Sequence, residues 1–118
     1  MNTVVIKTID RAKVTSAMQD YALRITREHP EISRVIWFGS WINGHPSPGS
    51  DVDLCLIVNA TDVPFRDRAA AYLPVGFPVG IDLFVYTEGE FESLDQVSPG
   101  WKKEILRGIE LEKSVSPW

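Results

Sequence analysis

The sequence predicts an α/β (α+β) fold in which helices cover at least one face of one small β-sheet. Helix-like and strand-like patterns of apolar residues alternate along the 118 residues, and no repeat or low-complexity segment interrupts them. Hydrophobic residues make up 44% of the chain and charged residues 24%, which is typical of a globular domain with one modest core. We therefore expect a single domain over residues 1–118.

The first third of the chain is predicted to hold one amphipathic helix. Apolar residues recur at three- and four-residue intervals from Arg11 to Glu28, which places them in one stripe on a helix. Asp10 is a candidate cap, and Pro30 ends the helix because the residue before a proline avoids the α region. The apolar run at residues 4–6 has two interpretations, an edge strand or an ordered arm.

Two apolar runs rich in β-branched and aromatic residues, at 34–38 and 52–58, are predicted to be buried strands. Gly39 allows a tight exit from the first strand, and Ser40–Asn43 is predicted to form a single helical turn. Residues 44–50 contain two prolines and two glycines, so we expect a loop that leads into the second strand.

The second half of the chain is predicted to place a third strand among short helices. In order, we expect a helix at 65–73, a strand at 79–86, one helical turn within 88–95, a helix from 99 to about 107 and a short strand at 109–112. Pro64 is typical of a helix start and Gly108 of a helix C-terminus.

Two carboxylates open the second predicted strand. Because side chains alternate along a strand, Asp51 and Asp53 point to the same side, with Cα atoms roughly 6.6 Å apart. Like charges this close raise each other's pKa unless a cation lies between them. Mg²⁺ binds carboxylate oxygens and commonly leaves its other positions to water and substrate phosphates, so this pair is a candidate metal site.

The spacing of these residues resembles a known family. Gly39-Ser40, ten further residues and then Asp51-Val52-Asp53 form the GS-x10-DxD signature of the DNA polymerase β-like nucleotidyltransferases. The flanking segments RVIWFGS and SDVDLCLIV resemble the minimal nucleotidyltransferase subgroup, and the resemblance spans roughly residues 10–110. It implies a mixed, polymerase β palm-like sheet and a third carboxylate on a later strand, for which Asp82 lies in the expected place.

The resemblance also implies a chemistry for these residues. Nucleotidyl transfer, here of AMP from ATP to an acceptor hydroxyl, stabilises charge on the attacking and leaving oxygens, commonly with two metal ions. Asp51, Asp53 and Asp82 would be the catalytic residues and would hold two Mg²⁺ ions, with Mn²⁺ as the alternative ion. Gly39 and Ser40 would bind the β- and γ-phosphates of ATP through backbone N–H groups and the serine hydroxyl.

Each of these residues also has a purely structural interpretation. Asp51 and Asp53 could cap a loop, Gly39-Ser40 could be an ordinary helix cap, and Asp82 could be a surface residue beside a turn. One position departs from the family pattern, because Asn43 stands where relatives often carry an arginine. His45 either replaces that missing charge or is simply solvated.

Composition restricts the partners and the compartment. The net charge is −4 and no Lys/Arg run is present, which argues against a protein whose main task is binding a nucleic-acid backbone. The single cysteine, Cys55, lies in an apolar run, so no disulfide framework is expected. With neither a signal peptide nor an apolar membrane span in the sequence, we expect a soluble cytoplasmic protein.

Two functions of different classes remain open from the sequence. The first is an active nucleotidyltransferase, which by resemblance would be the antitoxin that adenylylates a separate helical toxin partner of the HEPN type. In that case the partner, or a second copy of this chain in a homo-oligomer, would complete the site. The second is an inactive or weak nucleotidyltransferase-fold binding module that neutralises a partner by contact, for which Asn43 is the supporting residue.

Overall fold

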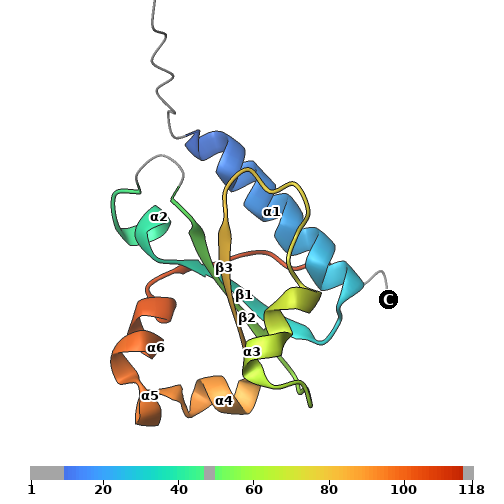
Figure 1. Cartoon of the computed structure of the whole chain (residues 1–118), viewed down its shortest axis with the longest axis vertical. Helices are drawn as coiled ribbons and strands as arrows, with labels where there is room; N and C mark the ends of the chain where they lie inside the picture. The colour runs from blue at the N-terminus through green and yellow to red at the C-terminus, as the bar shows by residue number, and fades with distance from the viewer. Residues whose placement is uncertain (1–9, 47–49, 116–118) are drawn as a thin grey trace, which may run out of the picture.

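The computed structural model describes residues 10–46 and 50–115, and the apolar run at residues 4–6 lies outside them. The described elements, shown in Figure 1, are α1 (Arg11–Glu28), β1 (Ile32–Phe38), α2 (Ser40–Asn43), β2 (Val52–Val58), α3 (Phe65–Arg68), a 3₁₀ turn η1 (Ala69–Ala71), β3 (Ile81–Thr87), α4 (Glu88–Glu92), α5 (Leu94–Val97), α6 (Pro99–Leu106) and β4 (Ile109–Glu110).

The four described strands form one mixed sheet in the order β3-β2-β1-β4. β1 pairs antiparallel with both β2 and β4, whereas β2 pairs parallel with β3. The C-terminal end of β1 therefore meets the N-terminal ends of β2 and β3 at one end of the sheet. The predicted fold class and the mixed sheet are confirmed.

Side chains alternate along each strand, so apolar residues point to both faces of the sheet. Helices cover both faces. One face packs against α1, and Figure 1 shows α4, α5 and α6 on the other side of the molecule from α1. The α1 face contains Met18, Tyr21, Ala22, Val35, Leu54, Leu56 and Val58. The opposite face contains Ile36, Phe38, Cys55 and Ile57, which pack against Phe91 of α4 and Ile105 of α6.

The observed bounds agree with most of the predicted elements. α1, α2 and β2 have the predicted limits, and the Lys13 N–H donates to Asp10 Oδ1 at 2.9 Å as expected for a helix cap. β1 begins two residues earlier than predicted, and β3 is displaced by one or two residues at each end. The helix predicted at 65–73 is shorter, since α3 tightens into the 3₁₀ turn η1.

The segment at 88–95 holds two helices where one turn was predicted. Thr87 and Glu90 form a capping box, in which each side chain accepts a hydrogen bond from the other residue's backbone N–H. This reciprocal pair satisfies two backbone donors at the start of α4. The helix is therefore stable directly after β3, and α5 follows it as a second short helix.

A partly buried ion pair links α3 to α4, the helix that directly follows β3. The Arg68 guanidinium is buried and bonds to both carboxylate oxygens of Glu90, while it also donates to the carbonyl oxygens of Val63 and Val85. Hydrogen bonds from Arg68 lower the pKa of Glu90 to about 2. The strand that carries Asp82 is thus fixed at its far end by charge-assisted hydrogen bonds.

We expect Glu90→Gln to lower the free energy of unfolding by about 1 kcal/mol above pH 4.5, because the variant loses the ion pair with Arg68. The loss is small because solvent screens the half-exposed carboxylate. The folded-state pKa of Glu90 lies below its ordinary value, so the ionised pair contributes fully above pH 4.5. This contribution is lost as the pH falls towards about 2. Thermal melts across this range should show the gap between wild type and variant closing at low pH, whereas the exposed Glu92→Gln control should show no such gap.

Candidate active site

The predicted site residues gather at one end of the sheet. Gly39 connects β1 to α2, Ser40 is the first residue of α2, and Asp51 directly precedes β2. Asp53 is the residue in β2 that pairs with Asp82 in β3. The structure therefore brings Asp53 and Asp82 together from segments well separated in the sequence.

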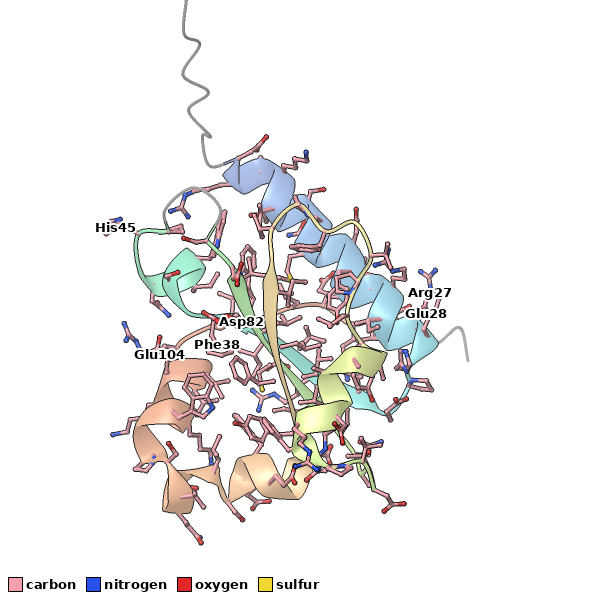
Figure 2. The ribbon with its side chains drawn as sticks, viewed as in Figure 1. Arg27, Glu28, Phe38, His45, Asp82 and Glu104 are labelled. Carbon is pink, nitrogen blue, oxygen red and sulfur yellow. The ribbon has the colours of Figure 1, made fainter. Side chains whose placement is uncertain are left out.

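Strand register accounts for this arrangement. Phe38, the last residue of β1, pairs with Asp53, which in turn pairs with Asp82. These three residues form one row across the sheet, and Gly39 follows that row immediately. Figure 2 shows Phe38 and Asp82 at this end of the sheet, with Glu104 of α6 nearby.

Two glycines leave room for two of the carboxylates. Gly39 has a φ of +86°, a backbone conformation that favours glycine, and a Cβ at this position would collide with Asp53 Oδ2. A Cβ on Gly80 would collide with Asp51 Oδ1. Any larger residue at position 39 would strain the backbone and displace the Asp53 carboxylate.

The charges in this region repel one another. Asp53 is half-buried, and its pKa is raised by burial first and then by the negative charges of Asp82, Asp51 and Glu104. Within residues 10–46 and 50–115, the carboxylates of Asp51, Asp53 and Asp82 have no hydrogen bond or ion pair. A carboxylate that capped a loop would accept a hydrogen bond, so this arrangement does not support the structural interpretation of these residues.

The chemistry of these side chains fits a divalent cation. Carboxylate oxygens are hard ligands of the kind that Mg²⁺ binds, and a cation would offset the mutual repulsion that raises the pKa of Asp53. In the part of the chain that the structure describes, no group of three or more His, Cys, Asp or Glu side chains is placed to hold a metal ion. The three-carboxylate metal site of Asp51, Asp53 and Asp82 stays a prediction.

Ser40 is not a helix cap. The N-cap of α2 is Gly39, which has no side chain to cap the helix, and Ser40 is exposed. Among the described residues its hydroxyl makes no hydrogen bond, so it is available to a ligand. The next residue, Trp41, is buried, and its indole Nε1 donates to the Ser50 carbonyl oxygen at 3.0 Å.

Sequence reasoning missed Glu104, which lies near the aspartates, and its ion-pair partner Arg107. Glu104 of α6 acts on Asp53 electrostatically, and Arg107 Nη1 lies 3.5 Å from Glu104 Oε2. Asn43 Nδ2 donates to the Arg107 carbonyl oxygen at 3.0 Å, which attaches α2 to the end of α6. His45 is exposed and points outward from the molecule in Figure 2, in agreement with the solvated interpretation.

A mixed sheet with Gly-Ser after one strand and aspartates at the starts of the next two has the arrangement that the resemblance implies for a nucleotidyltransferase. Residues 20–74 match the family model described as "Nucleotidyltransferase domain". This match includes Gly39, Ser40, Asp51 and Asp53, whereas the assignment of Asp82 depends on its register with Asp53. No curated protein sequence matches the chain.

A solved structure shares the fold. It is the crystal structure of a candidate nucleotidyltransferase from Sulfolobus solfataricus at 1.40 Å resolution, with a TM-score of 0.61 and 17% sequence identity. The similarity covers 93% of this chain and 89% of the other. The match over residues 20–74 supports a nucleotidyl-transfer function in general, and the solved structure supports the fold. In the described ranges no helix has both the length and the apolar character needed to cross a membrane.

We expect Asp53→Asn to leave the metal-free protein as stable as wild type at pH 7, or more stable. The pKa of Asp53 is raised above its ordinary value of 3.8, so ionisation of this carboxyl opposes folding once the pH exceeds that value. The asparagine variant escapes this penalty, and its advantage should shrink as the pH falls below 3.8. The measurement is a series of thermal melts in EDTA.

Asp20→Asn is a suitable control, since Asp20 is an exposed residue of α1 outside the site. Asp20→Asn should melt like wild type both at pH 7 and below pH 3.8. A lower melting temperature for Asp53→Asn at pH 7 would show that Asp53 supports the fold and would contradict the repulsion described above.

Proposed function

We propose that this protein is a metal-dependent nucleotidyltransferase that transfers AMP from ATP to an acceptor hydroxyl group. The observation that supports this function best is the row of unpaired aspartates beside Gly39 and Ser40. Maintaining like charges close together in a folded protein opposes folding, and a catalytic cation site is a physical reason to keep them. The family match supports nucleotidyl transfer in general, and the metal and the nucleotide are parts of this proposal.

The residues have distinct roles in the proposed reaction. Asp51, Asp53 and Asp82 would hold the divalent cation, Mg²⁺ or Mn²⁺, which would stabilise charge on the phosphate oxygens. Ser40 and the backbone around Gly39 bind the β- and γ-phosphates. The acceptor oxygen attacks the α-phosphorus, the bond to the β-phosphate oxygen breaks and pyrophosphate leaves. Asp82, as an exposed carboxylate, accepts the proton of the acceptor hydroxyl.

We further propose that the acceptor lies on a separate helical protein of the HEPN type, so that the chain acts as an antitoxin in the cytoplasm. This part depends on the family resemblance alone. The alternative, an inactive binding module, was favoured by Asn43. Asn43 Nδ2 donates a hydrogen bond to the Arg107 carbonyl oxygen, and this structural reason for an asparagine at the position supports the enzyme. We therefore favour the enzyme.

Binding of Mg²⁺ and ATP should stabilise the protein by mass action. At a concentration 100 times the dissociation constant, the gain is about 2.7 kcal/mol, which is several degrees in melting temperature for a domain of this size. Thermal melts should show this rise with Mg²⁺ and ATP together and a much smaller one with ATP in EDTA. A melting temperature that responds to neither would contradict the proposed function.

Transfer of label from α-labelled ATP tests the reaction itself. Wild type should label the partner protein or an acceptor in a cell lysate. Asp53→Asn should reduce the rate by at least about a hundredfold, because metal-ion stabilisation of the transition state is worth several kcal/mol. Asp20→Asn should retain wild-type activity. Wild type that labels no acceptor and yet neutralises its partner would favour the binding module.

A further inference from the structure

We propose that Arg107, at the C-terminal end of α6, is the cationic residue that binds the β- and γ-phosphates of the nucleotide. Glu104 holds its guanidinium until the nucleotide enters. This inference rests on the proposed function, since it names a further binding residue of the same site.

The backbone at Arg107 is anchored beside the site. Its carbonyl oxygen accepts the hydrogen bond from Asn43 Nδ2 at 3.0 Å. At the following residue, Gly108, a Cβ would collide with the Trp37 carbonyl oxygen and lie 2.7 Å from Phe38 Cβ. The end of α6 is therefore packed directly on the last residues of β1, immediately before Gly39.

Negative charges are in excess at this end of the sheet, and a cationic side chain would offset them. Asp53 experiences the negative charges of Asp82, Asp51 and Glu104, and a nucleotide adds the charges of its phosphates. Among these four carboxylates, within the described ranges, Glu104 alone has an ion-pair partner, which is Arg107. We therefore infer that the guanidinium paired with Glu104 is the cation that would attract a polyphosphate at this end of the sheet.

The Arg107–Glu104 pair is suited to exchange. The distance of 3.5 Å between Nη1 and Oε2 is long for a charge-assisted hydrogen bond, and the Arg107 side chain is 63% exposed. Exposed ion pairs of this kind contribute little to the stability of a protein, so the pair can be broken easily. A phosphate group can bind the planar guanidinium through two parallel hydrogen bonds, so it competes well against Glu104. Glu104 thereby keeps the guanidinium close to the site in the free protein.

The test is equilibrium binding of Mg²⁺–ATP and of AMP to wild type and to Arg107→Ala at one fixed salt concentration. We expect Arg107→Ala to weaken ATP binding by about ten- to one-hundredfold, the range for hydrogen bonds to a charged group. Binding of AMP, which lacks the β- and γ-phosphates, should be nearly unchanged. Arg66→Ala is the matched control, because Arg66 is an 87% exposed arginine on α3.

Three further variants test the exchange and the alternative cation. Glu104→Gln should tighten ATP binding, and this gain should be smaller in the Arg107→Ala background because the two residues are coupled. His45→Ala should bind ATP like wild type. Arg107→Lys keeps the charge but not the fork of donors, so it should bind ATP with intermediate affinity, and it replaces Arg107→Ala if that variant fails to fold.

The outcomes separate this inference from the proposed function. Wild type that binds no Mg²⁺–ATP would overturn both. Wild type that binds ATP, together with Arg107→Ala that binds it as tightly as Arg66→Ala does, would overturn the role of Arg107 alone. Equal losses for ATP and AMP would also overturn it, since the effect would then not arise from the β- and γ-phosphates.

Discussion

The site depends on the register of three strands. Antiparallel pairing aligns the end of β1 with the start of β2, and parallel pairing aligns the start of β2 with the start of β3. A slip of one residue between β2 and β3 would turn the Asp82 side chain to the opposite face of the sheet from Asp53. The buried residues that fix this register, on both faces of the sheet, therefore also fix the relative positions of the site residues.

The destabilisation caused by the aspartates is confined to a small region of the fold. Repulsion among the aspartates opposes folding, yet it acts at the exposed end of the sheet, where solvent screens much of it. Glycine at positions 39 and 80 gives the carboxylates room without disturbing the core. At the other end of β3 the Arg68–Glu90 pair and the capping box of α4 stabilise the same strand. The interactions that stabilise β3 and the candidate site residue Asp82 thus lie at opposite ends of the strand.

Local patterns predicted most of the fold and part of the site. The Gly39–Ser40 and Asp51–Asp53 pairs were recognisable because each is close in sequence and follows or opens a strand. The capping box at Thr87 and Glu90 was also readable from a Thr-x-x-Glu spacing, although only one helical turn was predicted there. Glu104 and Arg107 gave no such signal, because their place depends on how α6 packs against β1.

The connection between β2 and β3 has a consequence for the order of folding. Parallel neighbours cannot be joined by a tight turn, and here the chain passes through α3 and η1 before it returns as β3. Pairing of β1 with β2 closes a shorter loop and is expected to form earlier, since longer loops lose more entropy on closure. Asp53 is therefore expected to lie beside Gly39 before β3 brings Asp82 into register, so the candidate site would be completed late in folding.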